Sequence, residues 1–262
     1  MGKVYLTGAG PGDPELLTLK AARLLAAADV ILHDALVSTE VLSMASPGAL
    51  LVDVGKRCGT KLLTQDEINA LLIAYAKEHD IVVRLKGGDP ALFARAGEEV
   101  TALRDAGVEY EIVPGISAAF GAAAAAGISL TDRRLASQVL FTTFSRHSSG
   151  RDLGWRMIGN ATTVAIYMPG SDYGDVASHL LNAGVTADTP CVIVSQAGGK
   201  KQSLRWTTVA GLYDAEKLPA PALLIVGKVA SRNAQEVEAE VVLELLEKAR
   251  AFSPEVNPWS RN

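Results

Sequence analysis

The sequence predicts an α/β protein in which two α/β domains follow one another along the chain. Short apolar segments rich in β-branched residues alternate with helical patterns over residues 1–114, which is typical of a parallel, doubly wound sheet. A second series of strand-like segments, less strictly alternating, begins near residue 139. With 262 residues, 48% of them apolar, the chain can also bury a sizeable core.

Overall charge and cysteine usage argue against several classes of protein. The formal net charge is −4, from 25 basic and 29 acidic residues, so the molecule as a whole has no bias toward nucleic acid or membranes. Cys58 and Cys191 form no metal-type spacing, which is typical of a reduced, cytoplasmic protein. The first residues lack a signal-peptide layout, and the longest uncharged run, residues 118–131, is too short to span a bilayer. We expect a cytoplasmic protein without a membrane, nucleic-acid or metal partner.

The first strand, residues 4–6, leads into the run Gly8-Ala-Gly-Pro-Gly-Asp-Pro14. Asp13 is a suitable N-cap and Pro14 suits the first position of a helix, which we expect to reach about Ala28. A dinucleotide-binding fingerprint would need its third glycine where Asp13 stands, so the run does not indicate a Rossmann site.

Asp34 follows the second predicted strand, residues 30–33. Ligands bind beyond the carboxyl ends of strands in open α/β sheets, so Asp34 either faces a ligand or caps the turn before Ser38, and residue type alone favours the cap. A third strand, residues 50–54, precedes a basic, glycine-bearing loop at residues 55–61. That loop either binds an anion or forms a solvated turn.

The run Arg84-Leu-Lys-Gly-Gly-Asp-Pro90 is the stretch around which we interpret the rest of the chain. Before it come a capping box at residues 64–67, which starts a helix to about Glu78, and a buried strand from Ile81. The two glycines let a ligand approach the backbone and free N–H groups to point at it, and the aspartate offers a carboxylate. The alternative is an ordinary strand-to-helix turn in which the proline opens the helix. These residues alone support both interpretations equally, and the rest of the chain favours the ligand.

Three elements lead out of the first half of the chain. Residues 98–107 predict a helix that ends at Gly107, and residues 109–113 predict a fifth strand. Residues 116–127 predict a small-residue helix that is almost free of charge and therefore buried. Ser117 at its start either binds a ligand or caps the helix.

The second half of the chain predicts strands at residues 139–143, 163–167, 191–194, 204–207 and 222–226, with a helix at residues 173–182. The polar link at residues 144–151 contains His147, which we interpret as a solvated loop residue rather than a catalytic one. Residues 235–252 predict an amphipathic helix that docks on the core or on another subunit, and residues 255–262 a frayed end.

Seven short motifs in series resemble a known family. They are Gly8-Ala-Gly-Pro-Gly-Asp-Pro14, Leu32-His-Asp-Ala-Leu-Val37, Val54-Gly-Lys-Arg57, Val83-Arg-Leu-Lys-Gly-Gly-Asp-Pro90, Gly97-Glu-Glu99, Val113-Pro-Gly-Ile-Ser-Ala-Ala119 and Pro221-Ala-Leu-Leu-Ile-Val-Gly227. Each motif alone is weak, but in this order they resemble the uroporphyrinogen-III C-methyltransferases of the tetrapyrrole methylase family, over roughly residues 2–230.

The resemblance implies two α/β domains of the tetrapyrrole methylase type with the active site in the cleft between them. We expect an N-terminal α/β domain at residues 1–114, a C-terminal α/β domain at residues 115–230, and a C-terminal helix and tail at residues 231–262. The resemblance further implies a homodimer that methylates uroporphyrinogen III twice with S-adenosyl-L-methionine. The products would be precorrin-2, for sirohaem or cobalamin, and S-adenosyl-L-homocysteine.

Two other classes of function stay open at this point. One is a relative that methylates a later corrin precursor or another substrate such as ribosomal RNA or diphthamide. The other is a non-catalytic protein that kept the fold. The acidic balance and few aromatic residues argue against an RNA substrate. A scaffold would tolerate the loss of Asp34, Lys56 or Gly87-Gly88-Asp89, and all of these are present.

The resemblance also implies roles for individual residues. Asp34 matches a proton acceptor and Lys56 a proton donor. Basic residues are the candidate partners of a polycarboxylate substrate, namely Arg84, Lys86, Arg95 and Arg133, with Arg146 and Arg151 in the polar link. The implied cofactor-binding residues are Pro11, Gly87, Gly88, Asp89, Leu92, Ser117, Ala118, Met168, Ala197 and Ala222.

The chain departs from the family pattern in four places. Asp132 stands where the family has the histidine of Thr-His-Arg, Thr143-Phe-Ser replaces Thr-Gly-His, Pro169 intervenes before a glycine, and Ala197 replaces another glycine. We expect Asp132 to hold Arg133 in place through an ion pair, because an unpaired acid facing a polyanion costs binding energy.

Overall fold

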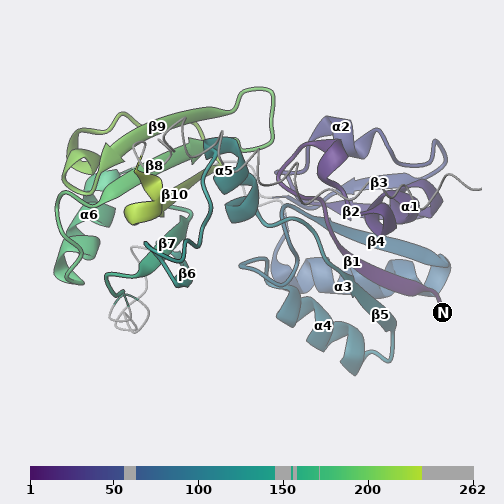
Figure 1. Ribbon diagram of the computed structural model, residues 1–262. Coiled ribbons are helices and arrows are strands. Elements are labelled where there is room, and N and C mark those ends of the chain that lie inside the picture. Colours follow the sequence, from purple (N-terminus) through teal and green to yellow (C-terminus); the bar gives the residue numbers. More distant parts are fainter. Residues whose placement is uncertain (56–62, 145–154, 156–157, 171, 232–262) are drawn as a thin grey trace, which may run out of the picture. The chain divides into compact units, whose positions relative to one another are not determined.

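The computed structural model describes residues 1–55, 63–144, 155, 158–170 and 172–231 (Figure 1). Contacts between residues divide the chain into one unit at Met1–Ala230 and another at Ser231–Asn262. Cys58, Lys56, Arg146, His147 and Arg151 lie outside the described residues, as does the predicted helix at residues 235–252.

The first sheet is entirely parallel and confirms the predicted doubly wound arrangement. In spatial order its strands are β3 (Leu50–Asp53), β2 (Val30–His33), β4 (Ile81–Lys86), β1 (Lys3–Gly8) and β5 (Glu109–Val113). Its four helices are α1 (Leu19–Ala27), α2 (Thr39–Leu42), α3 (Gln65–Glu78) and α4 (Ala96–Asp105).

Helices cover both faces of the first sheet, because apolar side chains of its central strand, β4, point alternately to one face and to the other. Val82 packs with the α3 and α4 side chains, whereas Val83 and Leu85 pack with those of α1 and α2. Arg84 and Lys86 have the same parity as Val82, so strand geometry directs both basic side chains toward the α3 and α4 face.

The second sheet is mixed, with β6 and β7 parallel and the remaining pairs antiparallel. In spatial order it contains β6 (Gln138–Thr143), β7 (Thr162–Tyr167), β10 (Ala222–Val226), β8 (Pro190–Ser195) and β9 (Ser203–Thr208). Side chains of α5 (Ala118–Ala126) and α6 (Tyr173–Asn182) belong to the two apolar clusters on this sheet. Short 3-10 turns follow at Ala210–Asp214 and Lys228–Ala230.

All five strands predicted for the second half are confirmed, as is the helix at residues 173–182. The first sheet lies within residues 3–113 and the second within residues 138–226. The domain boundaries at residues 114 and 230 stay predictions.

Two helix starts differ from the sequence-based expectation. Asp13 does cap a turn, but this is a 3-10 turn at Pro14–Leu16, and α1 begins only at Leu19 because Thr18 supplies a second N-cap. Its Oγ1 accepts a hydrogen bond from Ala21 N at 3.1 Å.

No helix begins at Pro90, so the alternative interpretation, in which this proline opens a helix, is wrong. Asp89 accepts the backbone hydrogen of Ala91 at 2.8 Å, which closes a local turn instead of a helical one. Phe93 and Arg95 then take left-handed backbone angles, with φ of 53° and 58°, and α4 starts at Ala96.

Two other local predictions hold. The capping box at Thr64 and Glu67 is present in both directions at the start of α3. α4 starts two residues before the predicted helix, and Gly107, with φ of 67°, stands just beyond its end.

In the part of the chain that the structure describes, none of the helices combines the length and the apolar character needed to cross a bilayer.

Candidate active site

A pocket lies at the carboxyl ends of the parallel strands. The residues that line it follow β1, β2, β4 and β5 on one side and belong to β7, β8, β10 and their adjoining loops on the other. The space between them, including its open mouth, is about 1020 Å³, which is large enough for a nucleoside-sized ligand. The lining residues are Gly10, Pro11, Asp34, Leu36, Gly87, Gly88, Asp89, Leu92, Phe93, Ala94, Ser117, Ala118, Tyr167, Met168, Val194, Ala197, Pro221, Ala222 and Leu223.

All ten residues predicted to bind the cofactor line this pocket, and so does the predicted proton acceptor Asp34. They come from seven separate segments of the chain, so residues that are far apart in sequence converge on one place. Their role in cofactor binding stays a prediction.

Glycines let the chain segments that follow β1, β4 and β5 approach one another beside the pocket. A Cβ atom on Gly8 would lie 2.6 Å from Gly88 O and 2.7 Å from the Gly115 backbone, which no side chain could tolerate. Gly88 N donates to Gly10 O at 2.8 Å, and Gly10 N donates to Gly88 O at 3.2 Å. The Gly88 N–H therefore holds the loop after β1 and does not point at a ligand, contrary to our expectation.

The Asp89 carboxylate fastens two loops of the pocket. One oxygen accepts the backbone hydrogen of Ala91 at 2.8 Å, and the other accepts that of Gly115 at 2.9 Å. The bond to Gly115 joins the loop after β4, in which Asp89 and Ala91 both lie, to the loop after β5. The carboxylate therefore shapes the pocket wall as well as lining it.

Backbone strain is concentrated at the pocket. Phe93 and Met168 line the pocket, and their φ angles are 53° and 50°. Arg95 and Gln196 are each adjacent in sequence to a lining residue, and their φ angles are 58° and 50°. These are the four non-glycine residues with left-handed φ in the described part of the chain. Such strain costs energy and is typical of binding and catalytic sites.

Tyr167 connects the two sides of the pocket and was absent from the sequence-based site. Its hydroxyl bonds with the Ser117 Oγ and accepts a hydrogen from Ala119 N at 3.1 Å, and its ring lies 5.0 Å from that of Phe93. Burial raises the pKa of Tyr167, so the phenol stays neutral. Ser117 is the N-cap residue of α5, but its side chain makes no capping bond and is directed to Tyr167 instead.

Asp34 is held by a buried cluster of charges beneath the pocket. Arg84 Nη2 pairs with Asp34 Oδ1, and Arg84 Nε donates to Glu99 Oε1 at 2.9 Å. Lys86 Nζ donates to both Glu99 oxygens, at 2.8 and 2.9 Å. The turn before Ser38 is closed by the backbone, so the Asp34 side chain is not its cap.

Burial acts on both basic groups of this cluster. It opposes the charge of Arg84, but the Asp34 and Glu99 carboxylates outweigh it and raise the pKa of Arg84. Burial and the nearby Arg84 charge lower the pKa of Lys86, although Glu99 opposes them. Arg84 and Lys86 are 3% and 2% exposed and do not line the pocket, so this arrangement does not favour their predicted contact with substrate.

The exposed basic residues behave differently from the buried pair. Arg95 forms a two-pronged ion pair with Glu98, at 2.7 and 2.6 Å. Asp132 pairs with Arg134 at 3.2 Å and not with Arg133, so the expected Asp132–Arg133 pair is wrong. The reason is local: Asp132 also accepts the Arg134 backbone hydrogen at 2.8 Å, which fixes its carboxylate on that neighbour.

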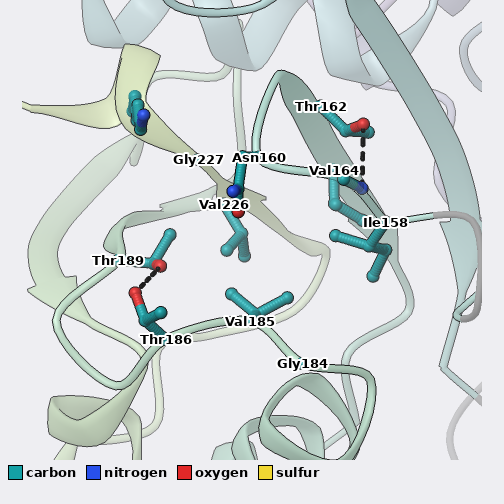
Figure 2. A pocket seen from close by; sticks show the side chains of 12 residues that line it. Ile158, Asn160, Thr162, Val164, Gly184, Val185, Thr186, Thr189, Val226 and Gly227 are labelled. Atoms are coloured by element: carbon teal, nitrogen blue, oxygen red, sulfur yellow. Dashed lines mark hydrogen bonds between the residues drawn. The ribbon is translucent and has the colours of Figure 1, made fainter.

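A second cavity lies at one end of the second sheet and has a different character. Figure 2 shows Thr186 and Thr189 joined by a hydrogen bond of 2.9 Å on one wall. Opposite, the Thr162 hydroxyl accepts the Gly159 backbone hydrogen at 3.2 Å, so these hydroxyls are used within the fold. Lys228 is the one ionisable side chain among its lining residues, and none of the predicted site residues lies there.

In the described residues, no group of three or more histidine, cysteine or acidic side chains is arranged to hold a metal. The first pocket instead combines glycine-rich loops, apolar walls and two anchored carboxylates, Asp34 and Asp89. This fold and site define a class of protein that binds a small organic ligand at the strand ends of an α/β sheet. The chain belongs to the tetrapyrrole (corrin/porphyrin) methylases, whose sequence profile matches residues 3–213.

Two relatives of known name are similar to this chain over most of its length. The chain is 44% identical over 236 residues to the uroporphyrinogen-III C-methyltransferase of Paracoccus denitrificans, covering 88% of this chain and 82% of that protein. It is 44% identical over 230 residues to the siroheme synthase of Actinobacillus succinogenes, covering 87% of this chain but 48% of that protein. The chain thus spans about half the length of this second relative.

A solved structure gives the same picture of the fold. The crystal structure of uroporphyrin-III C-methyl transferase from Thermus thermophilus complexed with S-adenyl homocysteine matches with a TM-score of 0.76 at 40% identity. The match covers 87% of this chain and 98% of that one.

Proposed function

We propose that this protein is an S-adenosyl-L-methionine-dependent C-methyltransferase that methylates uroporphyrinogen III twice to give precorrin-2. The observation that carries the proposal is the gathering of the ten predicted cofactor residues and Asp34 around one pocket. The relative from Paracoccus denitrificans, of which the chain covers 82%, bears the name of this activity. The solved relative from Thermus thermophilus was crystallised with the demethylated form of this cofactor.

The residues of the pocket suit this cofactor. Its walls are mainly glycine, alanine and apolar side chains, with Asp89 as a carboxylate and backbone carbonyls as further acceptors. A sulfonium and an adenine ring favour such walls, because they need apolar surface and acceptors but no cationic partner. When bound, S-adenosyl-L-methionine supplies an electrophilic methyl group.

The protein then contributes positioning and proton transfer. Asp89 and the close contact among Gly8, Gly88 and Gly115 hold the loops of the pocket together. These loops would fix the cofactor in line with a ring carbon of the substrate. Asp34 would accept a proton as charge develops on the attacked pyrrole ring. Lys56, which lies outside the described residues, is proposed as the proton donor from the family resemblance alone.

Substrate carboxylates would pair with basic side chains that remain accessible. Arg95 is 46% exposed at its side chain and stands just after the lining residues Phe93 and Ala94. Arg133 is exposed and is not engaged by Asp132. These two residues therefore replace Arg84 and Lys86 as the preferred substrate partners. A cytoplasmic homodimer remains part of the proposal.

The test is to incubate the protein with S-adenosyl-L-methionine and uroporphyrinogen III without oxygen and to measure the mass of the tetrapyrrole. We expect a gain of two methyl groups, and a much slower gain in Asp34→Asn. Binding of S-adenosyl-L-homocysteine without any methylation of uroporphyrinogen III would favour a later corrin precursor as the substrate. Asp132 stands where the family pattern has a histidine, so the variant Asp132→His would then test whether this difference determines the substrate.

A further inference from the structure

Arg84 occupies the middle of the first sheet, where an arginine side chain needs a reason to be buried. It stands on β4 beside Leu32 of β2 and directs its side chain to the face covered by α4. Its exposed fraction is 3%, and that of Glu99 on α4 is 0%. Charged groups at such depth are stable only when every one of them is paired.

Glu99 is the centre of the charge cluster. One carboxylate oxygen accepts from Arg84 Nε at 2.9 Å, from Lys86 Nζ at 2.8 Å and from Gln65 Nε2 at 3.3 Å. The other oxygen accepts from Lys86 Nζ at 2.9 Å. Together with Asp34 the cluster contains two acids and two bases, so its formal charge is balanced.

The guanidinium of Arg84 is held on three sides. Nε contacts Glu99, Nη1 donates to Leu32 O at 3.4 Å and to Leu85 O at 3.2 Å, and Nη2 is directed at Asp34. The Asp34 backbone is pinned at the same place, because its N–H donates to Leu85 O at 3.1 Å. The planar fork thus fixes both the position and the direction of the Asp34 carboxylate, which is 31% exposed and lines the pocket.

We propose that Arg84 is a positioning residue for methyl transfer: buried and fixed by Glu99 and Lys86, it holds the Asp34 carboxylate at the pocket. This proposal rests on the proposed function, in which Asp34 accepts a proton from the substrate. A lysine could not replace Arg84, because a single ammonium cannot reach Glu99 and Asp34 with the same fork. Asp34 would then be free to turn toward water.

The decisive comparison uses Arg84→Lys, Asp34→Asn and the double variant. Arg84→Lys should lower kcat about ten- to a hundredfold, because a misplaced acid–base group loses its alignment with the reacting atoms. The dissociation constant of S-adenosyl-L-homocysteine should not change, since Arg84 does not line the pocket. In the Asp34→Asn background, Arg84→Lys should cause no further loss of kcat.

A second variant guards against a folding defect. Arg84→Gln removes the positive charge but leaves Glu99 and Lys86 as a balanced pair, and the partly exposed Asp34 can be solvated. Crystal structures of both Arg84 variants should show the Asp34 carboxylate away from its present position. The matched control is Arg205→Lys, which alters the Arg205–Glu216 pair on β9, 2.7 Å in length, and should change neither kcat nor Asp34.

Two results would overturn the inference. One is an additive loss of kcat in the double variant, because Arg84 would then act independently of Asp34. The other is an unmoved Asp34 carboxylate in the Arg84 variants. If the unaltered protein does not methylate uroporphyrinogen III, the proposed function fails, but the crystal structures still decide whether Arg84 places Asp34.

Discussion

Asp89 performs two structural tasks with one side chain. Its two carboxylate oxygens accept the backbone hydrogens of Ala91 and Gly115, so it ties together two loops that line the pocket. A buried or partly buried backbone donor that loses its partner typically costs about 1–3 kcal/mol. The residue therefore affects the shape of the pocket through the backbone.

Asp89→Ala should abolish binding of S-adenosyl-L-homocysteine while the protein still folds, with a loss of about 1–3 kcal/mol in the free energy of unfolding. Calorimetric titration and thermal unfolding measure the two effects. Asp172→Ala is the matched control, because Asp172 also accepts a backbone hydrogen, from Gly174 at 3.0 Å, but at the start of α6. An Asp89→Ala protein with unchanged affinity would remove Asp89 from the binding site.

Asp34→Asn should slow methyl transfer far more than it weakens cofactor binding, because the proposed work of Asp34 is on the substrate ring. Asparagine has almost the same shape and can still accept from Arg84, so the pocket should keep its form. Steady-state kinetics and calorimetry with S-adenosyl-L-homocysteine separate the two quantities. Equal losses in both would assign Asp34 a structural role.

Strand β1 ends where three loops meet, and this meeting depends on missing side chains. Gly8 at the end of β1 faces the carbonyl of Gly88 and the backbone of Gly115 at distances that exclude a Cβ atom. The β1–β4 register places Gly8 beside Lys86, so any separation of the strands would also disturb the buried charge cluster. The pocket and the central strands are therefore coupled.

Gly8→Ala should destabilise the protein by about 1–3 kcal/mol and weaken S-adenosyl-L-homocysteine binding, because the backbones that it contacts must move apart. Gly48→Ala is the matched control, since no atom beyond the adjoining residues lies within 4 Å of the Cβ that it would introduce. Chemical denaturation and calorimetry of both variants test the coupling. Normal binding by Gly8→Ala would show that the loops can separate without consequence for the pocket.

The whole molecule carries a net charge of −4, yet its proposed substrate is a polyanion. Attraction must then come from local basic residues such as Arg95 and Arg133, whose field is screened by salt. The cofactor pocket relies on backbone and apolar contacts. The Michaelis constant for uroporphyrinogen III should rise with salt, whereas the dissociation constant of S-adenosyl-L-homocysteine should hardly change.

Arg133→Ala should raise the Michaelis constant for uroporphyrinogen III with little effect on that for S-adenosyl-L-methionine. Arg134→Ala is the control, because it removes the same charge from a neighbouring residue that already pairs with Asp132. Kinetics at low and moderate ionic strength measure both effects. Equal behaviour of the two variants would indicate a diffuse field and no specific contact by Arg133.

The sequence by itself determined the elements whose signals are local. The period-2 and apolar strand patterns, the Thr64–Glu67 capping box and the amphipathic α6 depend on residues within a few positions of one another. The family resemblance that the seven motifs carry also led to ten predicted cofactor residues that line the pocket, because a motif can be recognised without knowing how the loops meet.

Only the tertiary structure decided which charged side chains are accessible to a ligand. In sequence, Arg84 and Lys86 stand next to the predicted ligand-binding loop and were expected to bind the substrate. The pairing of β4 with its neighbours instead directs both side chains under α4 to Glu99. Tyr167 joins Ser117 across 50 positions of sequence, and Asp89 reaches Gly115 across 26. Such contacts follow from packing between distant segments, for which no local pattern exists. That is the physical reason why many residues that line the pocket could be predicted, whereas Tyr167 and the partners of Arg84, Lys86 and Asp89 could not.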